Sequence, residues 1–216
     1  TPALVLSGQV GNESFATSLA AGDLDDDGWL DLVIGAPNSM QAGTTLRPGD
    51  VRVYRGGPAA LLDPSPAPWL VFSGLEDGET FGRALAAGDV DGDGIDDLIV
   101  GAPANSAAGA QAGVVFVFLG GSALSSASAS AADVRLVPES AGDRFGRALA
   151  MGDANGDGRS ELLIGAPGHA GAGRSYLFLG ASSFPRTLAA EADYVFDGEV
   201  GSVGEFGSAV ALIDLN

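Results

Sequence analysis

Three short segments of this 216-residue chain gather the kinds of side chain that bind hard metal cations. Each segment places a carboxylate or amide oxygen at relative positions 1, 3, 5 and 9, and a glycine at position 6. Oxygen donors at alternate positions wrap around one cation, and the glycine allows the sharp turn between them. The spacing therefore predicts three Ca²⁺ loops, formed by Asp23, Asp25, Asp27 and Asp31; by Asp89, Asp91, Asp93 and Asp97; and by Asp153, Asn155, Asp157 and Glu161.

The rest of each loop separates this pattern from an EF-hand. An EF-hand has flanking helices and a bidentate glutamate at position 12, where this chain has isoleucine or valine. Position 9 must then close the site. A cage of many protein oxygens suits Ca²⁺ better than the smaller Mg²⁺. The backbone carbonyl at position 7 is expected to add a ligand in each loop, from Trp29, Ile95 and Arg159.

The loops leave alternatives open. Asp-Gly and Asn-Gly pairs also form β-hairpin turns that bind nothing, although a four-oxygen pattern that recurs three times favours a cation site. Asp26 and Asp96 lie off the pattern, and we expect them to support the ligands without touching the cation. Asp214 and Asn216 occupy positions 1 and 3 of a fourth, truncated loop. This predicts that the chain is a piece of a longer polypeptide or that partner molecules cover its ends.

The acidic loops lie inside an internal repeat. Similar segments start at Phe15, Phe81, Phe145 and Phe206, at spacings of 66, 64 and 61 residues. Each unit holds a short Ala-rich run, an apolar run that ends in glycine, a β-branched and aromatic run, and a fourth apolar run, separated by Gly, Ala, Ser and Pro loops. We expect strands at 15–22, 31–35, 51–55 and 69–74; at 81–88, 97–101, 113–119 and 134–138; and at 145–152, 161–165, 173–179 and 194–198.

Four antiparallel strands per unit and no helix predict an all-β fold made of β-propeller blades, which are four-stranded sheets packed face to face. Residues 1–216 then form a single propeller segment with three complete blades. The blades cover about 9–74, 75–138 and 139–198, residues 3–8 are the lone fourth strand of a preceding blade, and 199–216 start the next blade with a strand at 206–212.

Two short motifs recur at the ends of the repeat core: Phe-Gly stands at 81–82, 145–146 and 206–207, and Gly-Ala-Pro at 35–37, 101–103 and 165–167. These motifs resemble the FG-GAP repeats of the integrin alpha-chain N-terminal β-propeller. Ala16 replaces the glycine of the first unit. The resemblance covers practically the whole chain. It implies that each acidic loop joins the first and second strands of a blade, opposite the usual ligand-binding loops, and that the Ca²⁺ is structural.

Composition limits the partners. The net charge of −18 would repel nucleic acid and anionic membrane surfaces, and no apolar run is long enough to span a membrane. There is no cysteine, and His169 is the only histidine, so the chain offers no nucleophile with a base outside the acidic loops. Arg83 and Arg147, which follow Phe-Gly, are expected to be surface or inter-blade contacts. We do not expect an enzyme.

These features predict a Ca²⁺-stabilised extracellular or cell-surface scaffold for adhesion or protein interaction, since loops of this kind bind Ca²⁺ too weakly to fill in the cytosol. Its partners would be proteins or neighbouring copies of itself. One alternative is a subunit of a self-assembling, Ca²⁺-dependent surface filament or layer. Another is an accessory domain of a secreted hydrolase.

Overall fold

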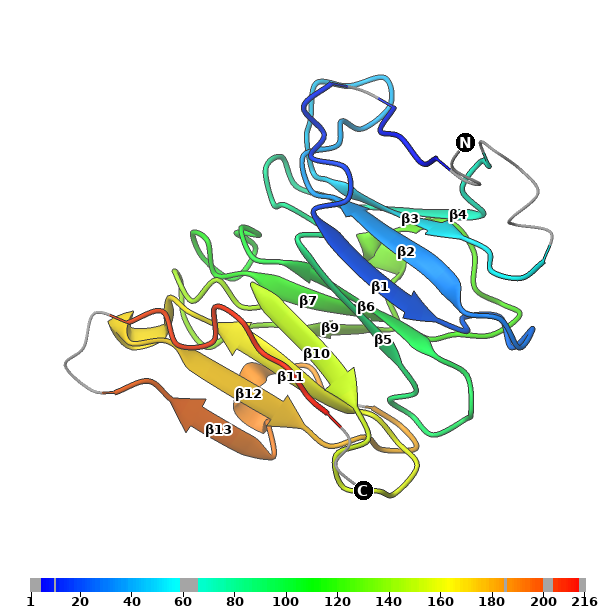
Figure 1. Ribbon diagram of the computed structural model, residues 1–216. Coiled ribbons are helices and arrows are strands. Elements are labelled where there is room, and N and C mark those ends of the chain that lie inside the picture. The colour runs from blue at the N-terminus through cyan, green and yellow to red at the C-terminus, as the bar shows by residue number, and fades with distance from the viewer. Residues whose placement is uncertain (1–4, 10, 59–65, 185, 200–203, 214–216) are drawn as a thin grey trace.

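The computed structural model describes residues 5–9, 11–58, 66–184, 186–199 and 204–213, and these form three antiparallel sheets that follow one another in the chain (Figure 1). The first four strands of each sheet are hydrogen-bonded in chain order. They are β1 (Ser18–Gly22), β2 (Asp31–Ala36), β3 (Asp50–Tyr54) and β4 (Leu70–Ser73); β5 (Ala84–Gly88), β6 (Asp97–Ala102), β7 (Val114–Phe118) and β9 (Val134–Leu136); and β10 (Ala148–Gly152), β11 (Glu161–Ala166), β12 (Arg174–Phe178) and β13 (Tyr194–Asp197).

The sheets are arranged as blades. Strands β1, β5 and β10 lie side by side along one side of the molecule, and the outer strands β4, β9 and β13 spread apart (Figure 1). The all-β class and the four-stranded antiparallel sheets are therefore confirmed. The described residues form an open row of three blades and no closed ring.

The first strand of each blade starts three residues later than the sequence predicted. The Phe-Gly pair forms a turn before the strand, with φ of 83° at Gly82 and 81° at Gly146. Glycine adopts positive φ without a steric penalty. In the first unit Ala16 occupies the same turn with φ of 62°, so the chain accepts a strained alanine there.

Two strands predicted at the ends of the chain are not found. Residues 5–8 carry no strand, and residues 3 and 4 lie outside the described part. In 204–213 the only ladder contact is a parallel bridge between Phe206 and Gly173. A strand needs neighbours on its hydrogen-bonding edge, and these segments lack enough of them.

One serine-rich segment, predicted as a surface loop, instead connects two blades. Within it, β8 (Ala127–Ser128) pairs in parallel with β4 of the first blade, and Ser126 Oγ accepts a hydrogen bond from Val71 N at 2.9 Å. The first sheet therefore has five strands. The described residues also contain three single 3₁₀ turns where no helix was predicted: η2 (Ala129–Ala131), η3 (His169–Gly171) and η4 (Ala189–Glu191).

Aromatic side chains fill the space between successive blades. Phe72 of the first blade meets Phe118 of the second at a ring-centroid distance of 4.6 Å. The Phe-Gly phenylalanines, Phe81 and Phe145, are fully buried, and Phe145 packs edge-on against Tyr176 at 5.4 Å. Each buried aromatic ring contributes roughly 1.5–3 kcal/mol of hydrophobic free energy. The blades are therefore held together chiefly by these inter-sheet layers.

The two ends of the FG-GAP motif meet between blades. A Cβ built on Gly35 would lie 2.2 Å from the carbonyl oxygen of Gly82, and one on Gly101 would lie 2.2 Å from that of Gly146. Only a glycine allows the backbones to approach so closely. Gly165 meets the carbonyl oxygen of Gly207 in the same way. The Gly-Ala-Pro glycine of one unit thus receives the Phe-Gly turn of the next.

The two ends of the row expose apolar side chains. Tyr194, Val195 and Phe196 on β13 are 56%, 43% and 46% exposed. At the other end Leu19 on β1 is 59% exposed. Phe206 is 45% exposed, whereas its counterparts Phe81 and Phe145 are fully buried. The described residues thus leave a sheet face open at each end.

Candidate metal centre

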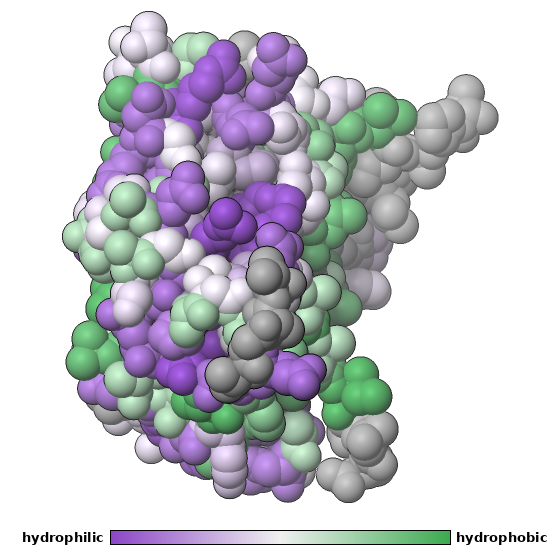
Figure 2. Space-filling model, turned by 90° about the vertical axis from the view of Figure 1, so that its left-hand side faces the viewer, coloured by the Kyte–Doolittle hydropathy of each residue, from purple (hydrophilic) through white to green (hydrophobic). Residues whose placement is uncertain are grey.

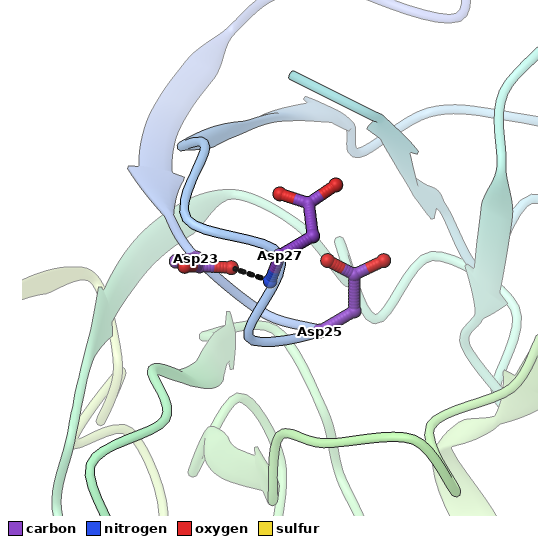
Figure 3. A group of neighbouring side chains, drawn as sticks. All are labelled: Asp23, Asp25 and Asp27. Carbon is purple, nitrogen blue, oxygen red and sulfur yellow. Dashed lines mark hydrogen bonds between the residues drawn. The ribbon is translucent and has the colours of Figure 1, made fainter. Parts of the chain in front are cut away.

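The acidic loops join the first and second strands of each blade, β1 to β2, β5 to β6 and β10 to β11. In the first loop Asp23 organises the turn, because its carboxylate accepts hydrogen bonds from the backbone nitrogens of Asp27 at 3.1 Å and Gly28 at 2.9 Å. Gly28 has φ of 84°, as the predicted sharp turn requires. Figure 3 shows the carboxylates of Asp25 and Asp27 side by side above this turn.

The first loop brings three carboxylates together. One oxygen each from Asp23, Asp25 and Asp27 lies within 4.8 Å of the others. The Asp25 side chain is 9% exposed, and its Oδ1 has no hydrogen-bond partner among the described residues. A buried carboxylate oxygen without a partner costs free energy unless a proton or a cation satisfies it. Asp31, the fourth predicted side-chain ligand, is not part of this group.

The second loop repeats this arrangement with a different third member. Oxygens of Asp89, Asp91 and Asp97 lie within 4.8 Å of one another, and Asp93 is outside the group. Asp97 is buried, and this loss of hydration raises its pKa to about 7. Burial, followed by the nearby charge of Asp93, also raises the pKa of Asp91. In both groups the cost of burial outweighs the backbone hydrogen bonds that favour the charged form.

The third loop has the same turn, but its position 3 holds the uncharged Asn155 where the other loops have an aspartate. Asp153 accepts hydrogen bonds from the backbone nitrogens of Gly156, Asp157 and Gly158, as Asp89 does from the same three positions of its loop. The Asn155 amide donates to Asp157 at 3.2 Å and to Glu161 at 2.9 Å. In the described residues no group of three acidic oxygens forms here.

The acid at position 9 also has a structural role that the spacing did not reveal. Asp97 accepts hydrogen bonds from Val90 N at the start of its own loop and from Gly120 N after the third strand, both at 2.9 Å. Asp31 does the same with Leu24 N and Gly56 N. In the third loop Glu161 accepts the equivalent bond inside the loop, from Ala154 N at 2.8 Å, and the described residues show no bond from it to the chain after the third strand. In the first two loops, position 9 therefore fixes the loop to its blade.

The side chains at position 7 pack on the chain that follows the third strand of the same blade. Trp29 lies on Gly57, Ile95 on Gly121 and Arg159 on Gly180. Their predicted role was to supply a backbone carbonyl, and that remains a prediction. The packing positions this part of the loop, although Trp29 itself is 52% exposed.

Two arginines near the loops were missed by the sequence analysis. Arg55 bonds Asp25 Oδ2 at 2.6 Å and lies 4.2 Å from the centre of the Trp69 ring. The side chain of Arg159 reaches the second loop, where a Cβ on Gly92 would lie 2.5 Å from its Nε. Each places a positive charge at an acidic loop. The signal in the sequence is weak, because leucine stands at the positions equivalent to Arg55 in the other repeats.

Asp96 connects two neighbouring loops. Its carboxylate accepts a hydrogen bond from Asp23 N at 2.9 Å, and its own backbone nitrogen donates to the Asp23 carbonyl at 3.1 Å. Burial raises the pKa of Asp96. At the equivalent position of the third repeat, the backbone nitrogen of Ser160 donates a hydrogen bond to the Asp89 carbonyl at 2.7 Å. Residues at position 8 therefore link each acidic loop to the preceding one.

Two of the predicted ligands, Asp214 and Asn216, lie outside the described residues. None of the helical segments in the described part of the chain has the length and apolar character needed to cross a membrane.

Stacked four-stranded blades with an acidic loop between their first two strands define a class of repeat protein. Residues 15–54, 81–118 and 145–178 match the FG-GAP repeat. The chain therefore belongs to the FG-GAP repeat family, as the resemblance of its motifs to integrin alpha chains predicted.

Proteins similar to this chain include integrin alpha chains and a phospholipase D. Integrin alpha-PS2 of Drosophila melanogaster is 35% identical over 188 residues, covering 83% of this chain and 12% of the relative. Integrin alpha-7 of Mus musculus is 36% identical, with coverages of 76% and 13%. Phosphatidylinositol-glycan-specific phospholipase D of Homo sapiens is 30% identical, with coverages of 73% and 19%. The chain thus spans less than a fifth of the length of these relatives.

Proposed function

We propose that residues 1–216 are a β-propeller segment whose acidic loops bind Ca²⁺, and that the segment is an extracellular scaffold for adhesion or protein interaction. The observation that carries the proposal is the convergence of three carboxylates in each of the first two loops. In the first of these, the buried Asp25 Oδ1 has no partner among the described residues. Oxygen ligands, carboxylates above all, are those that Ca²⁺ selects.

The residues present fit Ca²⁺ by their chemistry. The ion would supply the positive charge that the crowded carboxylates lack, and so remove their mutual repulsion. The proposed ligands are Asp23, Asp25, Asp27, the Trp29 carbonyl and Asp31; Asp89, Asp91, Asp93, the Ile95 carbonyl and Asp97; Asp153, Asn155, Asp157, the Arg159 carbonyl and Glu161; and, at the start of a fourth loop, Asp214 and Asn216.

The role of these ions would be structural. Asp31 and Asp97 are bonded both to their loops and to the chain after the third strand, so a cation that fixes them also fixes the blade. Sites of the extracellular kind bind Ca²⁺ with a dissociation constant of roughly 10⁻⁴–10⁻³ M, which supports a location outside the cell. The similarity to integrin alpha chains supports protein partners and no catalytic role.

Two other functions have an observation in their favour. The similarity to a phospholipase D supports an accessory domain in a secreted hydrolase. The exposed Tyr194, Val195 and Phe196 at one end of the row, and Leu19 at the other, support end-to-end assembly of copies into a filament.

Thermal unfolding with and without Ca²⁺ tests the proposal. A site held at a hundredfold excess over its dissociation constant adds about 2.7 kcal/mol, which is roughly 5–10 °C in the melting temperature of a domain of this size. For a dissociation constant of about 10⁻⁴ M, this excess requires about 10 mM Ca²⁺, and the melting temperature there should exceed that in chelator by this amount for each occupied site. Magnesium at equal ionic strength is the control, and it should restore much less. Equal melting temperatures in Ca²⁺ and chelator would refute the role of the ion.

Light scattering in the same two buffers separates scaffold from filament. A scaffold should give one mass in both buffers. A filament subunit should give large, regular assemblies in Ca²⁺ that dissolve on chelation. The second result would make assembly the function and replace the proposed scaffold.

A further inference from the structure

Two neighbouring arginines have no acidic partner among the residues that the structure describes. Arg83 and Arg147 follow the Phe-Gly pairs of the second and third repeats, and both side chains are half-buried. No hydrogen bond, ion pair or ring contact involves either guanidinium within the described residues. Arg174 and Arg186, by contrast, each bond a carboxylate at 3.0 Å or less. Three other arginines also lack an ion pair among the described residues, but Arg47 bonds the Asn38 carbonyl, Arg135 lies over the Phe116 ring and Arg159 lies against Gly92 of the second acidic loop.

The fold places these two arginines next to each other. Arg83 N donates to the Gly101 carbonyl at 3.2 Å. The Gly146 carbonyl, just before Arg147, touches the same Gly101, because a Cβ there would lie 2.2 Å from that oxygen. The two arginines thus flank one glycine at the start of neighbouring strands β5 and β10. Burial, and after it the charge of Arg147, lowers the pKa of Arg83.

The nearest acids in sequence are already engaged. Glu79 accepts hydrogen bonds from Leu75 N, Glu76 N and the amide of Asn105, and it is 1% exposed. Asp143 accepts hydrogen bonds from Ser140 N and is paired with His169 at 3.1 Å. Because these carboxylates have their own donors, they do not neutralise the arginines.

The arginine pair lies away from the acidic loops. The five residues of β5 lie between Arg83 and Asp89, the first ligand of the second loop, so the two are about 20 Å of extended chain apart. This exceeds the Debye length of about 8 Å at physiological salt, so the loops neutralise the pair only weakly. Figure 2 faces the side on which β1, β5 and β10 begin, and hydrophilic side chains gather across its middle.

We propose that Arg83 and Arg147 form a binding site for a single carboxylate, presented as an aspartate or glutamate side chain by a protein partner. Two guanidinium groups offer planar forks of donors that match a carboxylate, and an anion between them would relieve their repulsion. The net charge of −18 disfavours a polyanion such as nucleic acid, whereas one carboxylate adds little repulsion. As a statement about the partner, the inference rests on the proposed interaction role, but carboxylate binding itself does not.

The test follows the arginine Nε–Hε NMR signals of the ¹⁵N-labelled chain during titration with the blocked tripeptide acetyl-Gly-Asp-Gly-amide. Acetyl-Gly-Asn-Gly-amide is the neutral control, and phosphate is the competing oxyanion. Ionic strength is constant, and chelator keeps Ca²⁺ out of the titration. The signals of Arg83 and Arg147 should shift in a saturable way with the Asp peptide and not with the Asn peptide. Equal shifts with both peptides, or tighter binding of phosphate, would overturn the proposal.

Variants separate the site from general charge effects. In R83Q/R147Q the affinity for the Asp peptide should fall at least tenfold. R144Q removes one nearby positive charge that is 48% exposed and 3.7 Å from Glu205, and it should bind as the unchanged chain does. R83K/R147K keeps both charges and most of the stems, and should bind several-fold more weakly because the forks are gone. Binding that survives in R83Q/R147Q, or is lost equally in R144Q, would refute the site.

A second measurement distinguishes a binding role from a packing role. Removing two neighbouring like charges should leave the melting temperature of R83Q/R147Q unchanged or raise it. A marked fall, with R83K/R147K also unable to bind the peptide, would show that the arginines only support the blades. Melting in Ca²⁺ and chelator is recorded in parallel. If Ca²⁺ does not raise the melting temperature but the peptide still binds, only the proposed Ca²⁺ scaffold is refuted. If Ca²⁺ raises the melting temperature but the peptide does not bind, only the arginine site is refuted.

Discussion

The second and third acidic loops have the same backbone and different charge. In both, the aspartate at position 1 accepts three backbone hydrogen bonds, and the glycines at positions 4 and 6 have positive φ. In the second loop three carboxylates converge, whereas in the third the Asn155 amide bonds two of the acids. The shape of the loop therefore comes from position 1 and the glycines. The charge of the loop differs at position 3, where the second loop has Asp91 and the third has Asn155.

The largest expected difference between the second and third loops is the loss of melting temperature when the aspartate at position 5 is replaced. D93N keeps the Oδ1 acceptor for Ile95 N but removes one proposed ligand charge. In Ca²⁺ its melting temperature should fall by about 5–10 °C, and in chelator it should hardly change. D157N in the third loop should lose clearly less in Ca²⁺. D26N, which changes an exposed acid off the pattern, is the control. Equal losses for D93N and D157N would remove the difference between the loops.

The second prediction converts the third loop toward the second. N155D replaces an amide that donates to Asp157 and Glu161 by a fourth negative charge in the loop. Calorimetric titration should show a site with about tenfold higher Ca²⁺ affinity, equivalent to roughly 1.4 kcal/mol. In chelator the variant should melt a few degrees lower, because the added carboxylate is repelled. The reverse change, D91N, should weaken the second loop. An unchanged third site in N155D would disprove the role given to position 3.

The third prediction concerns the arginine that distinguishes the first loop from the second. Arg55 already bonds Asp25 Oδ2, so a cation in that loop must compete with the guanidinium. R55Q should raise the Ca²⁺ affinity of the first loop several-fold, as measured by titration. In chelator its stability should fall by less than about 1 kcal/mol, because Arg55 is half-exposed. R47Q is the control for loss of one charge. Weaker Ca²⁺ binding by R55Q would show that the arginine supports the site.

The smallest expected effect is at the link between loops. D96N keeps an oxygen that can accept from Asp23 N, whereas D96A removes it. Chemical denaturation should place D96N within about 0.5 kcal/mol of the unchanged chain and D96A about 1 kcal/mol lower. Equal stabilities for D96N and D96A would mean that this bond between loops contributes nothing.

The sequence predicted the blades well because their core signals are local. Apolar runs such as Leu98–Val100 are bounded by glycine or acidic residues, and their strands appear with only small shifts at the ends. The link between β8 and β4 could not be predicted, because residues 127 and 128 show no apolar alternation. Their pairing with Phe72 and Ser73 depends on how two blades stack.

The sequence located the predicted ligands, but it did not show which of them converge or which other side chains they contact. Spacing identified the acids, yet it did not show that Asp31 and Asp93 stand outside the two clusters of oxygens. It also gave no sign of Arg55, whose contact with Asp25 joins two places 30 residues apart. Such contacts depend on where β3 ends relative to the loop. Proposed ligands Asp214 and Asn216 remain predictions.

The meeting of the Phe-Gly turn with the glycine of the preceding unit has a consequence for how such chains change in evolution. Each unit carries both halves of this inter-blade contact. Its Phe-Gly turn packs on the glycine of the preceding unit, and its own Gly-Ala-Pro glycine accepts the turn of the following unit. A duplicated stretch of DNA that encodes one unit therefore brings a complete inter-blade contact with it. The number of units can grow or shrink by copying or deletion, and no new contact has to arise by mutation.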